Sequence, residues 1–117
     1  LSTLPTPDVT STVARLHAMF PSIEREIGRI RLSEVLRGVV SQRLLPRKDE
    51  GTRIPAVEVL VTNSEVRALL RDPERVGGLR GLMAEGQAEG MQTMDQHVAR
   101  LLEEGLIAPE TSAALSV

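Results

Sequence analysis

The sequence lacks cysteine, tryptophan and tyrosine, and Phe20 is its single aromatic residue. Without cysteine, disulfide bonds, thiol catalysis and cysteine-rich zinc sites are excluded. The near absence of aromatic rings removes the platforms on which the bases of single-stranded nucleic acid usually stack. No run of about 18 apolar residues, the length that crosses a bilayer, is present, and the stretch LSTLPTPDVT has no signal-peptide pattern. We therefore expect a soluble, intracellular protein without membrane insertion.

The composition is that of an ordinary globular protein, with 117 residues of which 41% are hydrophobic and 26% are charged. This length suits one domain with one core. The net charge is −2, yet the stretch from Arg25 to Arg53 holds eight basic and four acidic side chains. A nucleic-acid binder using this basic stretch is the weaker alternative, because the chain is acidic overall and shows no helix-turn-helix pattern. We expect no nucleic-acid partner.

The first part of the chain predicts two helices. Asp8 or Thr10 caps the first, which ends before Pro21. Its apolar stripe consists of Val9, Val13, Leu16 and Phe20. Ser22 caps a second and longer helix, whose apolar residues continue as far as Val40 and which Gly28 and Gly38 weaken.

The middle of the chain predicts a β-hairpin. Its apolar runs are Leu44–Leu45 and Val57–Val61, joined by a polar loop that includes Gly51. Alternation of valines with Glu58 between them predicts a strand whose Glu58 face is the wetter one. Pro55 fits only the start or the edge of such a strand.

Three further helical segments complete the prediction. Ser64 caps a short helix that turns Val66, Leu69 and Leu70 inward and Arg67 and Arg71 outward, and that Pro73 ends. Another helix begins near Leu79 and ends near Gly86 or Gly90, and Pro109 starts the last one, which runs through Leu115. Together with the helix described next, the fold class is α+β and mostly helical, with about six helices and one antiparallel hairpin.

The stretch GMQTMDQHVARLLEEGLI, residues 90–107, reads as a helix with well-made ends. Thr93 and Gln96 have the spacing of a capping box. Asp95 lies in the first turn, where the helix dipole favours a negative charge. Gly105 suits the left-handed residue that follows a helix, and Leu106 can pack back on the last turn. Its polar cluster is therefore interpreted as the start of a helix rather than as a chemical site.

The residues that usually carry chemistry are sparse. His17 and His97 are far apart, and neither has a cysteine or carboxylate at ligand spacing, so we expect no metal site. The sequence contains no glycine-rich phosphate loop ending in Lys-Ser/Thr, no G-x-S-x-G and no H-E-x-x-H. From its residues alone, the chain does not look like an enzyme.

Three blocks in order carry a family resemblance. They are RLSEVLRGVVSQRLLPRKDEGTRIPAVEVLV, EVRALLRD and GMQTMDQ. They resemble the C-terminal part of a twitching-motility ATPase, the PilT-type pilus-retraction motor of the secretion-ATPase superfamily. In that family a helix and the S-Q-x-L motif lead into a strand A-x-E-(V/I)-(L/M), an A-I-R-N-L-I-R-E helix and G-M-Q-T-M-D-Q. The matches run from about Leu4 to Leu115.

The resemblance implies a fold and a role. Residues 1–117 would form a single module, the C-terminal part of a RecA-like motor domain, with the PAS-like N-terminal domain and the Walker A and Walker B region upstream. Family members form hexameric rings that use ATP and Mg. Their C-terminal helices relay ATP-driven rotations to the pilus platform protein at the inner membrane, so the protein would be cytoplasmic and peripheral to that membrane. For this chain alone the resemblance implies no cofactor and no ATP hydrolysis.

Two sets of site residues follow from the resemblance. Arg67, Leu69 and Arg71 match the R-x-L-x-R of the A-I-R-N-L-I-R-E helix, which is implicated in retraction rather than in nucleotide binding. Thr3, Leu4 and Thr6 match the histidine box T-L-H-T, in which Pro5 replaces the histidine that senses the terminal phosphate. Proline has neither a ring proton nor a backbone donor, so this role is not filled. An adaptor that keeps the docking surface of the motor is the alternative function.

Overall fold

The computed structural model describes residues 3–4, 6–49, 51–72 and 74–115. The α-helices are α1 (Val9–Ala18), α2 (Arg25–Val35), α3 (Ser64–Arg71), α4 (Leu79–Glu85), α5 (Met94–Glu103) and α6 (Pro109–Leu115). Short 3₁₀ turns cover Ser22–Glu24, Val76–Gly78 and Gln87–Glu89. The strands β1 (Gly38–Pro46) and β2 (Arg53–Val61) form an antiparallel pair. The predicted class, six helices and one hairpin, is confirmed.

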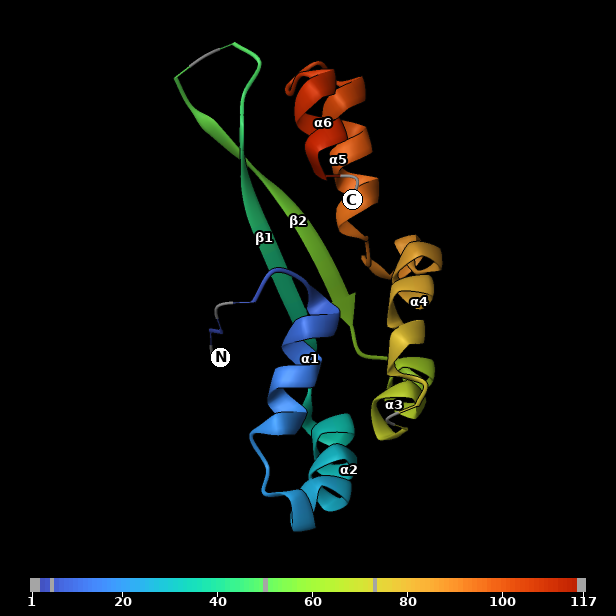
Figure 1. The fold of residues 1–117 in the computed structure, drawn as a ribbon. Coiled ribbons are helices and arrows are strands. Elements are labelled where there is room, and N and C mark those ends of the chain that lie inside the picture. The colour runs from blue at the N-terminus through green and yellow to red at the C-terminus, as the bar shows by residue number, and fades with distance from the viewer. Residues whose placement is uncertain (1–2, 5, 50, 73, 116–117) are drawn as a thin grey trace.

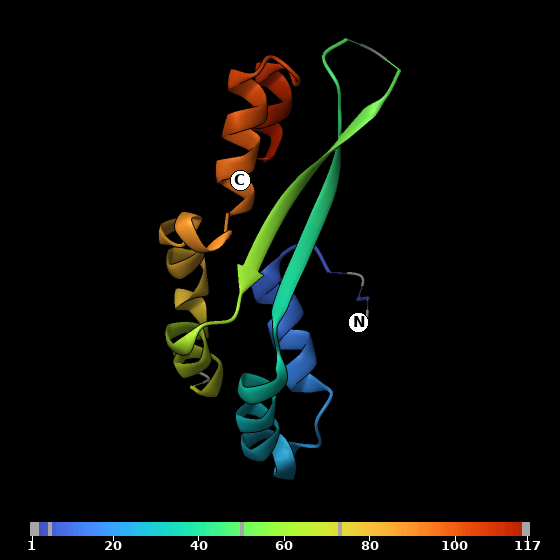
Figure 2. The same cartoon turned by 180° about the vertical axis from the view of Figure 1, so that it is seen from behind.

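The hairpin forms the long axis of an elongated molecule of 50 × 27 × 26 Å. In Figure 1, α1 and α2 lie at the end opposite the hairpin loop, and α3 to α6 form a column along the β2 side. The reverse view in Figure 2 shows the same order and leaves the outer edge of β1 uncovered by helices along the upper half of the strand. At the loop end, the N–H of Lys48 donates to the carbonyl of Leu106 at 2.9 Å and joins the hairpin to the turn before α6.

The second helix is shorter than the sequence predicted, and this boundary was wrong. α2 ends at Val35, Leu36 is extended (φ −68°, ψ 125°), and β1 begins at Gly38. A Cβ on Gly38 would meet the carbonyl oxygen of Leu60 at 2.9 Å, so glycine lets the two strands approach closely here. Val39 and Val40 are β-branched and fit the strand better than the helix.

Two predicted caps were also wrong. Ser22 begins a 3₁₀ turn that has no side-chain cap. The cap of α3 is Asn63 rather than Ser64, because the Asn63 side chain accepts from the N–H of Val66 at 2.8 Å. Asp8 caps α1 as predicted, accepting from the N–H of Ser11 at 2.7 Å. Caps are interchangeable by residue type, so a neighbouring Ser and Asn cannot be told apart from sequence alone.

The apolar interior is divided into two clusters. The first core cluster contains Val9, Val13, Leu60, Val66, Leu69, Leu70, Leu79, Met83 and Met91. The second core cluster contains Leu45, Ala56, Met94, Val98, Leu101 and Ile107. Strand β2 contributes Leu60 to the first and Ala56 to the second, so this strand connects the two halves of the molecule.

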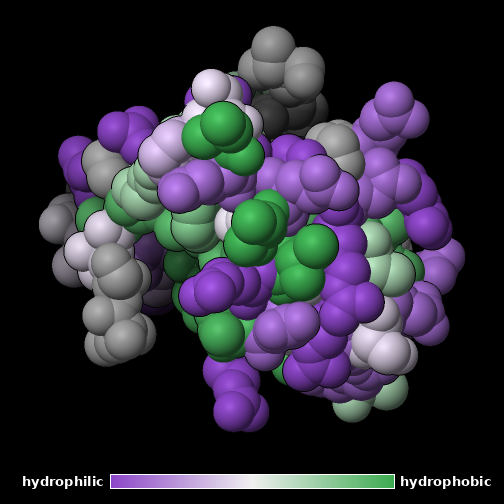
Figure 3. Space-filling view, turned by 90° about the horizontal axis from the view of Figure 1, so that it is seen from below, coloured by the Kyte–Doolittle hydropathy of each residue, from purple (hydrophilic) through white to green (hydrophobic). Residues whose placement is uncertain are grey.

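One end of the molecule leaves large apolar side chains exposed. Ile23, Ile27 and Ile30 follow one face of the α2 region and are 91%, 59% and 41% exposed. Figure 3, viewed from the α2 end, shows hydrophobic side chains gathered among polar ones near the centre of this face. On β1, Val40 and Leu44 are also exposed. Gly28 of α2 is covered instead, since a Cβ there would lie 2.5 Å from Cγ of Phe20.

Candidate interaction site

Helix α3 carries the predicted retraction-type motif. The charges at its two ends complement the helix dipole, because Glu65 lies in the first turn and Arg71 in the last. Val66, Leu69 and Leu70 are buried in the first core cluster, as the sequence predicted. The opposite side of the helix, including Ala68, is exposed. The helix therefore has one face fixed to the core and one available for a partner.

The three motif residues do not share one surface. Leu69 is 7% exposed and belongs to the core. The Nε of Arg71 donates to the Oγ of Ser33 on α2 at 3.0 Å, and Ser33 is itself fully buried. Arg67 is half-buried. Leu69 thus holds α3 in the core, and Arg71, although exposed, is bonded to α2. Arg67 is the motif residue that neither lies in the core nor carries such a bond among the described residues, which makes it the candidate contact for a partner.

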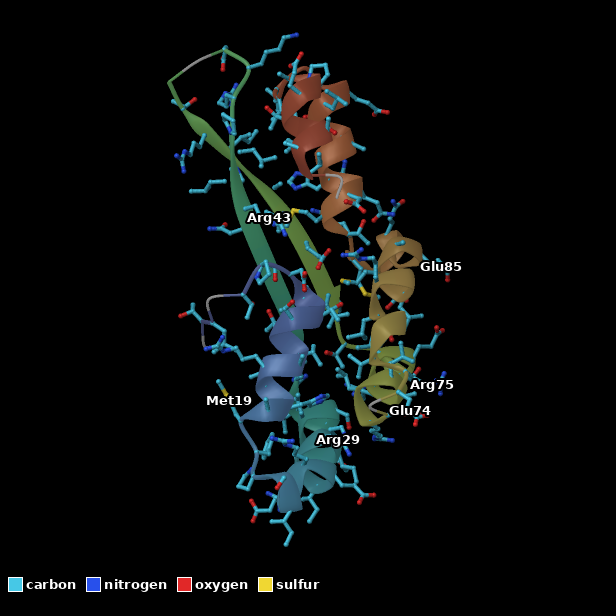
Figure 4. The ribbon with its side chains drawn as sticks, in the orientation of Figure 1. Met19, Arg29, Arg43, Glu74, Arg75 and Glu85 are labelled. Atoms are coloured by element: carbon cyan, nitrogen blue, oxygen red, sulfur yellow. The ribbon has the colours of Figure 1, made fainter. Side chains whose placement is uncertain are left out.

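A shallow cavity of about 530 Å³ opens beside α3. Its lining residues are Glu65, Ala68, Leu69, Arg75, Gly78 and Leu82. Figure 4 shows Arg75 next to Glu74 on the outer side of the α3 and α4 column. The cavity combines an apolar base with one acidic and one basic side chain at its rim, which suits a short segment of another protein better than a small charged ligand.

The G-M-Q-T-M-D-Q block forms a junction beneath this surface. The backbone of Gln92 pairs with Val59 of β2 in both directions, at 2.9 and 3.1 Å. The side-chain Nε2 of Gln92 donates to the carbonyl of Val57 at 2.7 Å. Three hydrogen bonds therefore tie this residue to the strand.

The capping box of α5 is confirmed. The Oγ1 of Thr93 accepts from the N–H of Gln96 at 3.1 Å, and the Oε1 of Gln96 accepts from the N–H of Thr93 at 2.9 Å. The Nε2 of Gln96 also donates to the carbonyl of Ala84 at 2.9 Å, which fixes α5 to α4. The polar cluster is thus a structural connection, and the left-handed Gly105 (φ 73°) ends the helix as predicted.

The prediction that Glu58 lies on the wetter face of β2 was wrong. Glu58 is 1% exposed, and its neighbours on the same face, Ala56 and Leu60, are equally buried. Its Oε1 accepts from the N–H of Val9 and its Oε2 from the N–H of Met94, each at 2.9 Å. Helices α1 and α5 cover this face and supply the partners that a buried carboxylate requires.

The two histidines are not brought together. The Nδ1 of His97 accepts from the N–H of Val57 at 2.7 Å. Burial, with the nearby Arg100, lowers the pKa of His97, although Glu104 acts in the opposite direction. Burial and the charge of Arg29 lower the pKa of His17. Within the described ranges, no three His, Asp or Glu side chains form a group that could hold a metal ion.

The stability of the protein is expected to fall as the pH decreases from about 6.5 through the lowered folded-state pKa of His97. The folded-state pKa of His97 lies below its ordinary value of 6.5, so the unfolded chain binds the proton first as the pH falls. Protonation of Nδ1 also removes the acceptor for the Val57 N–H. The contribution is complete above about 6.5 and is lost as the pH falls through the folded-state pKa. Urea denaturation at several pH values measures it.

A matched pair of variants separates the two histidines. His97→Gln is expected to reduce this pH dependence, and His17→Gln removes the second contribution of the same sign. A wild-type stability that stays constant over this pH interval would contradict the assignment.

The residues that match the histidine box line a second and larger groove. It has a volume of about 1030 Å³, and its lining includes Thr3, Leu4 and Thr6 together with Val39 and Ser41 of β1. Thr6 and Thr12 share a hydrogen bond between their hydroxyls. Pro5 lies outside the described residues.

This groove fits a magnesium triphosphate poorly. Among its described lining residues the one cationic side chain is Arg37, and none of them is a carboxylate. A triphosphate site normally combines several backbone and cationic donors with an acidic ligand for Mg²⁺. The lining of Leu16, Leu32 and Val35 is more typical of a protein contact.

The basic stretch is spread over the molecule rather than gathered on one face. Arg25, Arg29 and Arg31 belong to α2, Arg43 to the middle of β1, and Arg53 to the start of β2. Figure 4 shows Arg29 and Arg43 at different heights along the long axis.

In the parts of the chain that the structure describes, every helix is too short or too polar to traverse a bilayer.

The chain is similar to pilus ATPases over most of its length. No family model matches it. It is 42% identical to a twitching motility protein of Neisseria gonorrhoeae over 110 residues, which are 94% of this chain and 29% of that protein. It is 34% identical to the type IV pilus retraction ATPase PilT of Pseudomonas aeruginosa, again over 94% of this chain and 31% of the relative. The chain thus spans less than a third of the length of these relatives.

Solved structures agree with these sequence matches. The crystal structure of the pilus retraction motor PilT with bound ADP matches 93% of the chain and 29% of that motor, with a TM-score of 0.75 and 36% identity. The ATPase DotB of Legionella pneumophila matches 94% of the chain and 29% of that protein, with a TM-score of 0.75 and 27% identity. The fold is therefore that of a segment of the secretion ATPases.

The sequence identities narrow the assignment within the secretion ATPases. Both curated relatives are named for twitching motility or pilus retraction, and one of the matching structures is a retraction motor. The resemblance to the C-terminal part of a PilT-type ATPase, predicted from the sequence blocks, is confirmed.

Proposed function

We propose that the chain acts as the C-terminal, force-relaying part of a pilus retraction ATPase. The observation that carries this proposal is the 42% identity to a twitching motility protein over 94% of the chain. The relay itself would use the rigid column of α3, α4 and α5, which Gln96 and Arg71 connect to neighbouring helices. In this proposal the protein works in a cytoplasmic homo-oligomer next to the inner membrane.

The proposed contact with the pilus platform protein lies on the outer side of α3. The proposed contact comprises Arg67, the motif arginine that is not bonded to a neighbouring helix, and the cavity bounded by Glu65, Ala68 and Arg75. An apolar side chain of the platform protein would enter the cavity, with polar partners for its charged rim. Leu69 contributes to the cavity lining from the core, and Arg71 connects α3 to α2.

The chain alone is proposed neither to bind nor to hydrolyse ATP. The groove beside Thr3 and Thr6 has one cation, Arg37, and lacks a carboxylate among its described lining residues. Nucleotide binding would be supplied by parts of the motor outside this chain. Calorimetric titration of the purified 117-residue protein with ATP and Mg²⁺, together with a phosphate-release assay, tests this: measurable turnover would refute it.

A chimera tests the relay. This chain replaces the matching segment of the Neisseria gonorrhoeae protein, and twitching and phosphate release are both measured. We expect the chimera to support both activities. Arg67→Ala should abolish twitching and leave phosphate release, because the motif acts on the partner and not on the nucleotide. Arg80→Ala, an exposed arginine of α4, is the matched control and should change neither.

The adaptor alternative rests on a specific observation. Ile23 and Ile27 on the α2 side, and Val40 on β1, are large apolar residues more than half exposed. Such a surface normally contacts another protein. If the chain is an adaptor, it will form a stable heteromer with a full-length motor in a size-exclusion experiment, and the chimera will not support twitching.

A further inference from the structure

The carboxylate of Glu58 joins three segments that the sequence presents separately. Glu58 belongs to the A-x-E strand motif, Val9 follows the match to the histidine box, and Met94 belongs to the G-M-Q-T-M-D-Q block. One oxygen of Glu58 accepts from Val9 and the other from Met94, both at 2.9 Å. These N–H groups are those of the first residues of α1 and α5.

The local caps do not duplicate these two bonds. The side chain of Asp8 accepts from Ser11, and that of Thr93 accepts from Gln96. The N–H groups of Val9 and Met94 would otherwise be buried without an acceptor, since the first residues of a helix have no intrahelical partner. Glu58 therefore completes the N-termini of both helices at once.

The charge of Glu58 is balanced without a cation. Among the described residues, the one ion pair joins Arg47 and Asp49 in the loop of the hairpin and does not involve Glu58. Each helix N-terminus carries a partial charge of roughly +0.5, so two of them approach the opposite of one carboxylate. The arrangement depends on α1 and α5 being present together, because loss of either leaves a buried oxygen unpaired.

We propose that Glu58 is a positioning residue that makes α1 and α5 move as one unit. This inference rests on the proposed function, in which α1 follows the segment of Thr3 to Thr6 and α5 belongs to the relaying column. A displacement of the start of α1 would weaken the hydrogen bond from Val9 to Glu58. The carboxylate would then shift, and the hydrogen bond from Met94 to its other oxygen would weaken as well. The coupling is reciprocal, as equilibrium coupling between two sites must be.

Amide hydrogen exchange on the isolated chain, followed by NMR, tests the coupling. Asp8→Ala loosens the start of α1 and is expected to speed exchange at Val9 and also, by about tenfold, at Met94. Conversely, Thr93→Ala loosens the start of α5 and is expected to speed exchange at Val9. Rates are compared with that of the amide of Leu70, a buried residue of α3 that lies outside the two coupled helices. Unchanged protection of Met94 in Asp8→Ala would overturn the proposal.

The Glu58→Gln variant supplies the decisive comparison. Its amide offers one oxygen and one NH₂ group, so it cannot accept from both helices. In this background Asp8→Ala should affect Val9 alone, whereas a purely structural role would leave the effect on Met94 in place. Glu85→Gln, on the exposed side of α4, is the control. If Glu58→Gln does not fold, the reciprocal effects of Asp8→Ala and Thr93→Ala still decide the question.

The exchange experiment involves neither ATP nor pili, so it fails or succeeds independently of the chimera. A coupled pair of helices in a chain whose chimera does not twitch would count against the proposed function alone.

Discussion

Replacing Leu60 with alanine is expected to lower the free energy of unfolding by about 3 kcal/mol. Leu60 is 1% exposed and lies in the first core cluster with residues of α1, α3 and α4. Truncation removes buried apolar surface and leaves a cavity that the surrounding helices fill only in part. Urea denaturation, with the midpoint read at a constant m-value, measures the change.

Val40→Ala is the matched control for Leu60→Ala. Val40 lies on the other strand of the same hairpin and is 69% exposed. Its truncation should change the free energy of unfolding by less than about 0.5 kcal/mol. An equal decrease in the free energy of unfolding for the two variants would mean that Leu60 has been wrongly assigned to the core.

Leu101→Ala is expected to cost about 2–4 kcal/mol for the same reason in the other half of the molecule. Leu101 of α5 is 4% exposed and belongs to the second core cluster. We expect a single cooperative transition rather than two, because β2 supplies Ala56 to one cluster and Leu60 to the other. Denaturation followed by circular dichroism and by NMR should give coincident curves.

The exposed Glu103 of the same helix provides the comparison. Glu103→Ala should stay within about 0.5 kcal/mol of the wild type. Two separate transitions for Leu101→Ala would show that the second core cluster unfolds independently.

Features that depend on neighbouring residues were predictable from the sequence. The capping box of Thr93 and Gln96, the left-handed Gly105 and the start of α6 at Pro109 all follow from spacings of a few residues. The inward face of α3 followed from helical periodicity. That periodicity already placed Leu69 in the core, which is where the structure has it.

Features that depend on distant residues were not predictable. The partners of Glu58 are 49 and 36 residues away, so nothing near it in sequence shows what satisfies it. Alternation alone identifies two faces of a strand but not which of them other elements cover. Likewise, Leu36, Val39 and Val40 are apolar, and their spacing suits either a helix or a strand. Pairing of Val39 with Leu60 across the hairpin decides between them.

The hydrogen bond of Arg71 shows that a motif taken from a family does not by itself define the role of each of its residues. A family motif assigns Arg67, Leu69 and Arg71 one role, but Leu69 is buried in the core, Arg71 is bonded to α2, and Arg67 has neither constraint in the described part of the chain. The mutational tests of docking therefore concentrate on Arg67, since loss of Arg71 also loosens the contact between α2 and α3.

The uncovered edge of β1 has a practical consequence for handling the polypeptide. Among the described residues, this nine-residue strand pairs with β2 alone, and Val40 and Leu44 are 69% and 53% exposed. Such a row of unpaired backbone amides and carbonyls is a template for strand addition. Concentrated preparations will therefore tend to precipitate, and strong expression will tend to produce inclusion bodies. A lysine in place of Val40 or Leu44 would act as a gatekeeper and keep the polypeptide in solution.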